Sequence, residues 1–430
     1  MQEHPGAPGV AGAPGDEARR AVAEAHRREW AFVLAATARV TRDLDIAEEC
    51  VQDAYVAALD AWARQGVPRN PGAWLTTAAR HRALDGLRRD RTLRAKLPLL
   101  IVPGAEQEPA GAADGAIPDD RLRLIFTCCH PALAREAQVA LTLRLVCGLT
   151  TGEIAQAFLV SEPTMAARVT RAKKKISAAR IAYRVPEAAE LPDRIDAVLT
   201  VVHLLYTTGH TDPVGSGLVR ADLVERAVGL ARMLHELMPD EPEVTGLLAL
   251  LLITDARRAA RTDNAGNLLL LEQQDRSLWD SGAIAVGGAL VAEALRRGAP
   301  GRFALQAAIA AVHAEAPSYP ATDWAQILLL YDRLIRVWPS PVVALNRAVA
   351  VAMVCGPQAA LAEIEELERD GRLDGYRYLP ATKADLLRRL GRLVQARAAY
   401  AEALGLAENA AERSFLAGRI AEMSRPTQGP

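Results

Sequence analysis

The residues best suited to chemistry lie in one segment, 149–176, with the sequence LTTGEIAQAFLVSEPTMAARVTRAKKKI. Its second half carries five cations against the single carboxylate of Glu162; the cations are Arg168, Arg171, Lys173, Lys174 and Lys175. The whole chain has only five lysines, so three in a row stand out from the background. A cluster of this kind can neutralise the phosphates of a nucleic-acid backbone.

The same segment predicts two short helices joined by a tight turn. Thr150 and Glu153 have the spacing of a capping box at the start of the first helix. The second helix restarts at Ser161, and Pro163 falls in its first turn, where the missing N–H costs little. This pattern indicates a helix-turn-helix whose second helix faces DNA. A helical hairpin with a solvated basic face is the alternative.

Two predicted helices upstream carry opposite charges. In residues 45–62 the apolar side chains share one face, and the other face is acidic. In residues 74–91 arginines crowd the helix, while Ala79, Ala83, Leu84 and Leu87 are expected to pack inward. The first helix would suit a basic protein surface, and the second would suit a phosphate backbone.

Composition narrows the classes of protein. The chain has 430 residues, of which 50% are hydrophobic, and its net charge of −1 requires any nucleic-acid affinity to come from local basic stripes. Five scattered cysteines do not suggest a disulfide framework, and Cys128-Cys129-His130 has no second ligand pair at metal spacing. We therefore expect no metal and no cofactor. No apolar run reaches membrane-spanning length and no signal peptide is evident, so a cytoplasmic protein is expected.

Helical periodicity runs through the chain, and strand patterns are almost absent, which predicts an all-α fold. We expect a flexible tail at 1–18, a helical domain at 19–96, a Pro/Gly/Ala-rich linker at 97–118, a second helical domain at 119–185 and a helical extension at 186–430. Residues 320–420 repeat small and aromatic residues at intervals typical of tetratricopeptide (TPR) repeats, as in Trp324, Ile327, Tyr331, Leu334 and Pro339. A generic helical bundle is the alternative there.

Together these segments resemble a bacterial RNA polymerase sigma factor of the extracytoplasmic-function group. The likeness rests on D-x-A-E-E-x-V-Q-D-A-Y at 45–55, W-L-x-x-x-A-R-x-R-A-L-D-x-L-R-R at 74–89, and G-L-T-T-x-E-I-A followed by R-V-x-R-A-K-K-K-I within 148–176. The resemblance implies a region 2 domain that binds the polymerase clamp coiled coil and reads the −10 promoter element. It also implies a region 4 domain that binds the −35 element and the polymerase flap.

The resemblance also assigns site residues. The implied polymerase contacts are Asp45, Glu48, Gln52, Asp53 and Tyr55. The implied −10 residues are Asn70, Arg80, His81, Arg88 and Arg89. The implied −35 residues are Thr164, Ala167, Arg168, Arg171 and Lys174. His81 stands where many relatives have asparagine, and Ala166 and Ala167 replace longer polar residues, so the promoter sequence is not predicted.

The long extension resembles a subgroup with a C-terminal TPR-like domain, which implies a regulatory role in place of a separate inhibitory protein. Its polar cluster includes Gln273, Asp275, Arg276 and Trp279, and could form an internal hydrogen-bonded corner or a docking site. His203, His210 and Asp212 are expected to be packing or capping residues. No phosphate loop, serine elbow or spaced metal ligands appear, so no enzymatic activity is expected. The main rival is a helix-turn-helix regulator with a sensor domain that does not initiate transcription; a protein-binding scaffold is another.

Overall fold

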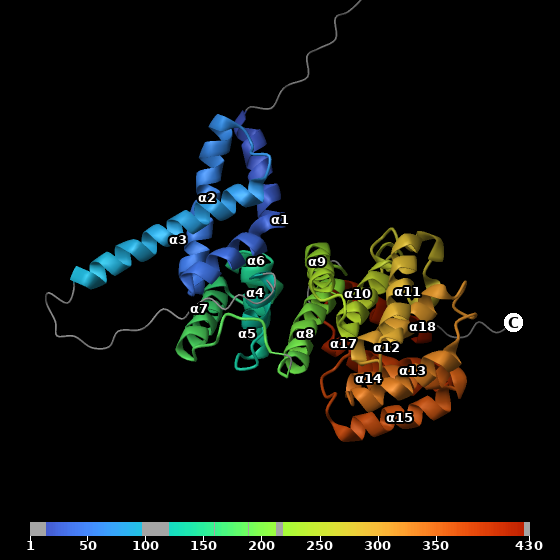
Figure 1. Ribbon diagram of the computed structural model, residues 1–430. Coiled ribbons are helices and arrows are strands. Elements are labelled where there is room, and N and C mark those ends of the chain that lie inside the picture. Colours follow the sequence, from blue (N-terminus) through green and yellow to red (C-terminus); the bar gives the residue numbers. More distant parts are fainter. Residues whose placement is uncertain (1–13, 97–119, 159, 188, 212–217, 425–430) are drawn as a thin grey trace, which may run out of the picture. The chain divides into compact units, whose positions relative to one another are not determined.

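The computed structural model describes residues 14–96, 120–158, 160–187, 189–211 and 218–424 (Figure 1). Throughout these ranges the chain is helical apart from loops and one isolated antiparallel bridge between Thr262 and Leu268. The all-α prediction is therefore confirmed. The predicted linker lies outside the described residues, as does the tail up to residue 13.

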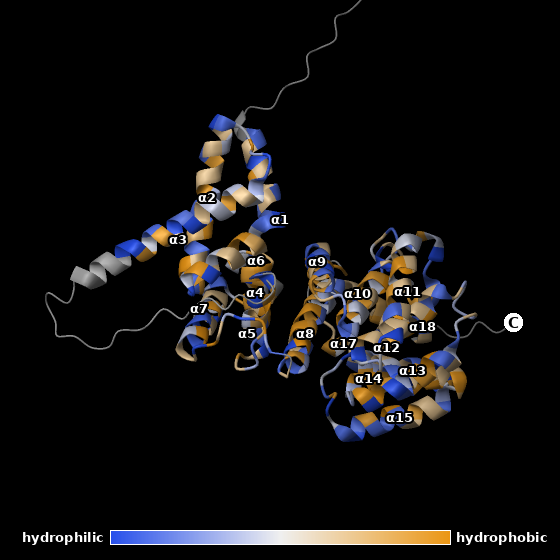
Figure 2. Ribbon diagram, in the orientation of Figure 1, coloured by the Kyte–Doolittle hydropathy of each residue, from blue (hydrophilic) through white to orange (hydrophobic). Residues whose placement is uncertain are grey.

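The chain divides into two compact units, Met1–Val201 and Val202–Pro430. The division falls within helix α8 (Leu191–His210), beyond the boundary predicted at residue 186. In Figure 2 hydrophobic and hydrophilic bands alternate along most helices, as expected of amphipathic helices that each bury one side.

The first unit begins with three helices, α1 (Pro14–Thr41), α2 (Leu44–Gln65) and α3 (Pro71–Lys96), which pack on one another. Asp43 caps α2 by accepting hydrogen bonds from the N–H groups of Asp45 and Ile46. Gly66, with φ of 81°, ends the helix. The predicted apolar face of α2 is buried, as expected. Leu84 was expected to pack inward, but it is 43% exposed, so this prediction is wrong.

Five shorter helices follow in the same unit. They are α4 (Asp120–Cys128), α5 (Arg135–Leu141), the π-helix η2 (Thr142–Val146), α6 (Thr151–Ala157) and α7 (Glu162–Ala178). The predicted capping box is present, since the Thr150 amide donates to Glu153 over 2.7 Å and the Glu153 amide donates to Thr150 over 3.2 Å. Ser161 caps α7, and a proline occupies its first turn, as predicted. The π-helix was not predicted.

Helix α1 joins these two groups of helices, because it packs on α2 and α3 and also on α4 and η2. The buried indole N–H of Trp30 donates to the carbonyl oxygen of Leu145 in η2 over 3.1 Å. Tyr183 donates through its hydroxyl to the carbonyl of Ala35 over 3.0 Å. The two groups therefore share a packed seam within the unit.

The second unit is a succession of helices that mostly contact their neighbours in the chain. They are α9 (Ala221–Leu237), α10 (Pro242–Asp255), α11 (Ser281–Arg296), α12 (Arg302–Glu315), α13 (Trp324–Val337), α14 (Pro341–Val354), α15 (Pro357–Asp370), α16 (Tyr378–Arg389), α17 (Leu393–Leu406) and α18 (Ala410–Ser424). Three 3₁₀ turns, η3 (Arg258–Ala260), η4 (Leu271–Gln273) and η5 (Arg276–Leu278), lie between α10 and α11. Residues 244–253 of α10 are all buried, which makes this helix the centre of the packing.

Gly148 offers a test of the seam. It has φ of 70°, and a Cβ there would lie 3.0 Å from His26 and from the ring of Trp30. We expect Gly148→Ala to lower the free energy of unfolding by about 1–3 kcal/mol, through backbone strain and this close contact. Chemical denaturation measures the change. Gly86→Ala is the matched control, since nothing lies within 4 Å of a Cβ at that helical position. The control should be neutral or stabilising, and equal losses in both variants would contradict the prediction.

Candidate polymerase and nucleic-acid interface

Helix α7 separates its apolar and basic faces. Met165, Val169, Ala172 and Ile176 are buried against the rest of the unit. Of the predicted −35 residues, Thr164, Ala167, Arg171 and Lys174 are exposed, and Arg168 is half-buried. Their spacing of three or four residues places them along one side of the helix. The structure thus presents them on a common accessible face.

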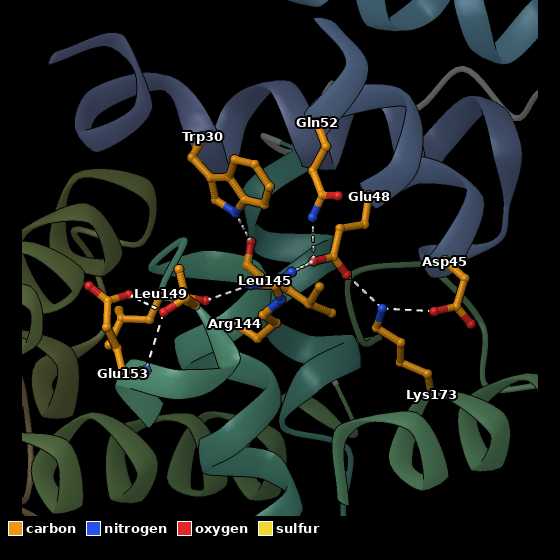
Figure 3. A network of polar contacts seen from close by, with 10 residues as sticks. Trp30, Asp45, Glu48, Gln52, Arg144, Leu145, Leu149, Glu153 and Lys173 are labelled. Atoms are coloured by element: carbon orange, nitrogen blue, oxygen red, sulfur yellow. Dashed lines mark hydrogen bonds and ion pairs between the residues drawn. The ribbon is translucent and has the colours of Figure 1, made fainter. Parts of the chain in front are cut away.

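The lysine run does not lie on one face. Lys174 and Lys175 are exposed, but the side chain of Lys173 is only 9% exposed and points toward α2 (Figure 3). Its ammonium lies 2.8 Å from a carboxylate oxygen of Asp45 and 2.6 Å from one of Glu48. Burial lowers the pKa of Lys173, but the two carboxylates outweigh that effect and leave its pKa above the usual value.

Glu48 is the centre of this network. It was predicted to lie on an exposed acidic face, but the residue is only 6% exposed, because α7 and η2 cover it. One carboxylate oxygen is 2.5 Å from the guanidinium of Arg144 and also accepts a hydrogen bond from Gln52 over 3.3 Å. The other oxygen binds Lys173 (Figure 3). Both oxygens are therefore occupied by groups of the same chain.

The remaining predicted polymerase residues differ in accessibility. Asp45, Gln52 and Asp53 are exposed, and Asp53 forms an ion pair with Arg82 of α3 over 2.7 Å. Tyr55 is buried, and its hydroxyl donates to the carbonyl oxygen of Ala25 over 3.3 Å. Burial raises the pKa of Tyr55 far above its ordinary value. In this structure Tyr55 supports α1 from inside and does not line the surface.

The predicted −10 residues lie on α3 and on the turn before it. His81, Arg88 and Arg89 are exposed, and Arg80 is half-buried. Asn70 is exposed, and its side-chain oxygen accepts a hydrogen bond from the amide of Ala73, so it also caps α3. Trp62 and Trp74 meet edge to face, with ring centroids 5.7 Å apart, and fix this turn to α2. The exposed part of α3 is thus cationic.

The sequence analysis missed Arg144 and Lys173 as partners of Glu48. Arg144 carried one usable signal, because it is the only charged residue in the apolar stretch 137–149. A lone arginine in such a stretch needs a partner when the stretch is buried. The identity of that partner was not available from local sequence, since Glu48 lies almost a hundred residues earlier.

Comparisons with known proteins agree with this arrangement. Residues 23–92 match the sigma-70 region 2 family, and residues 123–176 match sigma-70, region 4. The chain is also 45% identical, over 387 residues, to a Rhizobium meliloti (strain 1021) protein described as uncharacterized; the match covers 89% of this chain and 91% of the relative. The chain belongs to the sigma-70 family, in its extracytoplasmic-function group.

The sigma-70 match defines a coarse function, which is promoter-directed transcription initiation with core RNA polymerase and promoter DNA as partners. Families of this kind are not enzymes. Residues 194–295 match a further family of unknown function, DUF6596, so region 4 is followed by an additional domain. No solved structure matches the chain. Among the described residues, no helix is long and apolar enough to cross a membrane.

In the C-terminal unit the polar cluster forms an internal corner. Arg276 donates to the carbonyl oxygens of His313 and Ala316, each over 2.7 Å, and its guanidinium lies 4.3 Å from the ring centroid of the buried Trp279. Asp275 caps η5, and Gln273 accepts a hydrogen bond from the amide of Leu270. These contacts attach the loop before α11 to the end of α12.

The two histidines singled out in the sequence are half-buried. His210 accepts or donates a hydrogen bond with the hydroxyl of Tyr206 over 3.1 Å, and His203 packs edge-on against Phe303. Burial, with nearby arginines, lowers the pKa of His210 to about 2 and the pKa of His203 to about 4. Both contacts are those of packing residues. Asp212 lies outside the described residues.

Glu48→Gln tests the buried network. The amide cannot neutralise Arg144, which would be left with a buried positive charge. We expect the free energy of unfolding to fall by about 2–3 kcal/mol, measured by urea denaturation of the full chain. The control is Glu49→Gln, one residue along on the exposed side of α2, which should stay within about 0.5 kcal/mol of the parent protein. A neutral Glu48→Gln variant would refute the structural role of this carboxylate.

Proposed function

We propose that this chain binds core RNA polymerase through the acidic side of α2 and places α3 on the −10 element and α7 on the −35 element. The observation that carries the proposal is the pair of exposed cationic faces, on α3 and α7, in two helical groups connected by residues 97–119. A protein with a net charge of −1 needs such local faces to hold DNA. Their sequence motifs match region 2 and region 4 in the order that promoter recognition requires.

The two halves of α7 suit different contacts with DNA. A recognition helix reads base edges mainly from its N-terminal part, where Thr164, Ala167 and Arg168 lie. Lys174 and Lys175 are exposed at the other end and are better suited to phosphate oxygens. Only one long cation, Arg168, stands in the base-reading half. Region 4 would therefore contribute more to the affinity for DNA and to the position of the protein on it than to discrimination among −35 sequences.

A helix-turn-helix regulator that does not initiate transcription would also use α7. It would not need the acidic side of α2, where Asp45, Gln52 and Asp53 stay exposed beside the cationic α3. The two functions separate in one experiment. A sigma factor gives specific starts from a cognate promoter with core polymerase alone, whereas a regulator needs another initiation factor.

Arg88→Ala/Arg89→Ala should reduce specific transcripts in a reconstituted assay with core polymerase. We expect a loss of about tenfold or more, because two phosphate or base contacts on α3 are removed. The loss should shrink at low salt, where the remaining cations bind more strongly. Arg64→Ala, which removes an exposed arginine at the end of α2, should retain nearly full activity. Specific starts that survive the double substitution would contradict the role of α3.

We also propose that the C-terminal unit regulates initiation by receiving a ligand or partner. A cavity of about 640 Å³ lies within this unit, and its walls come from α12, α13, α14, α16, α17, α18 and the loop that includes η4. Its lining combines aromatic side chains with charged ones; the aromatic ones include Tyr319, Trp324, Tyr331, Tyr378 and Phe415, and the charged ones include Arg377, Arg388 and Glu412. The size and lining are those of small-molecule sites.

A bulky side chain in the cavity tests this regulatory role. Ala381 lines it from α16, so Ala381→Trp should fill part of the space and change the yield of specific transcripts, upward or downward, by at least threefold. The assay is again reconstituted transcription, with thermal melting to verify that the unit stays folded. Val394→Trp, at a position that is 83% exposed on α17, is the control and should have no effect. Equal yields from all three proteins would remove the cavity from the regulatory scheme.

A further inference from the structure

The seam between region 2 and region 4 occupies carboxylates on the side of α2 that the proposed function gives to core polymerase. Asp45 and Glu48 of α2 are bound by Lys173 of α7, and Glu48 is bound by Arg144 of η2 as well (Figure 3). With Glu48 only 6% exposed, an incoming basic surface cannot reach its oxygens. Region 4 therefore fills part of the site before polymerase arrives.

Promoter binding requires a different arrangement of the same two regions. The positions −10 and −35 differ by about 25 base pairs. This corresponds to roughly 85 Å of duplex at about 3.4 Å per base pair. In the structure the Lys173 ammonium on α7 touches α2 directly, so the two DNA-binding faces belong to one compact body. The chain between α3 and α4, residues 97–119, can reach about 80 Å when extended. Added to the lengths of α3 and α7, this reach is enough for region 2 and region 4 to bind the two promoter elements at the same time.

The ionic part of the seam, formed by Glu48, Arg144 and Lys173, suits a contact that opens. A buried ion pair gains Coulomb energy but loses the hydration of both ions, so its net contribution to stability is small. When the regions separate, Glu48, Arg144 and Lys173 all regain water, and the loss of their contacts is largely offset. An apolar seam of equal size would have no such compensation. The ions thus specify the closed arrangement without making it permanent.

We propose that the free protein is closed, with Arg144 and Lys173 of region 4 acting as an internal competitor for the polymerase-binding face of α2. The proposal rests on the proposed function, because it assumes that this face binds polymerase. Core polymerase binds only the open form. Its apparent affinity for the protein therefore falls in proportion as the open fraction becomes smaller. A signal received by the C-terminal unit could then act simply by changing that fraction.

Lys173→Glu tests the competitor. The new carboxylate would face Asp45 and Glu48, so repulsion replaces attraction between α7 and α2. Lys173 is not among the residues assigned to DNA. We expect the affinity of the full chain for core polymerase, measured without DNA by fluorescence anisotropy, to rise about tenfold. Arg135→Glu makes the same change of charge at an exposed position of region 4, on α5, which is assigned neither to DNA nor to polymerase, and should leave the affinity within twofold. Lys173→Gln is a milder second variant with an intermediate effect.

A distance measurement reports closure independently of polymerase. Spin labels at Asp60→Cys on α2 and Thr170→Cys on α7, both exposed, would be placed in a Cys147→Ser/Cys355→Ser background. The parent sequence should give one narrow distance, and Lys173→Glu should give a broad, longer distribution. If the variant stays folded and binds polymerase like the parent, the inference is overturned, whether or not the distance changes. If no variant and no parent protein binds polymerase, the proposed function itself fails.

Discussion

The buried carboxylate of Glu48 is the constraint on which the first unit depends. A charge with 6% exposure must be neutralised locally, and Arg144 and Lys173 do this from two different elements of region 4. Neither cation alone reaches both oxygens, so α2 is aligned with η2 and α7 at once. The indole of Trp30 and the hydroxyl of Tyr183 then bind backbone carbonyls across the same seam. Position is set by directed polar contacts as much as by apolar burial.

The π-helix η2 explains how Arg144 reaches α2. An extra residue in one helical turn changes the direction of the side chains that follow. The backbone N–H of Cys147 accordingly donates to the carbonyl oxygen of Thr142, five residues back. Leu143, Leu145 and Val146 remain buried, while Arg144 turns to Glu48 and to the carbonyl of Leu149. The same turn carries the carbonyl that accepts from Trp30. A local irregularity of five residues thus supplies two of the contacts in the seam.

Local signals predicted much of the fold, because caps and helix breaks depend on residues close in the chain. Thr150, Ser161 and Pro163 marked the N-termini of α6 and α7. The apolar periodicity of α2 predicted its buried face. What failed was the environment of the polar face. Periodicity places Glu48 on the side of α2 that faces away from the core of the first three helices. In the structure α7 and η2 cover this side. Lys173, the partner of Glu48 on α7, lies 125 residues away in the sequence. Leu84 failed for the reverse reason, since it stays 43% exposed among the residues that the structure describes.

Burial also limits how a stimulus could act on the C-terminal unit. Desolvation and arginines such as Arg257 hold the pKa of His210 at about 2 and that of His313 at about 4, and His203 is held at about 4 by burial and Arg302. These lowered pKa values favour the neutral imidazole near neutral pH. Their geometry and lowered pKa values fit a packing role better than that of a switch near neutral pH. Occupation of the cavity by a ligand, which is the regulatory route proposed above, needs no change in the charge of these three side chains.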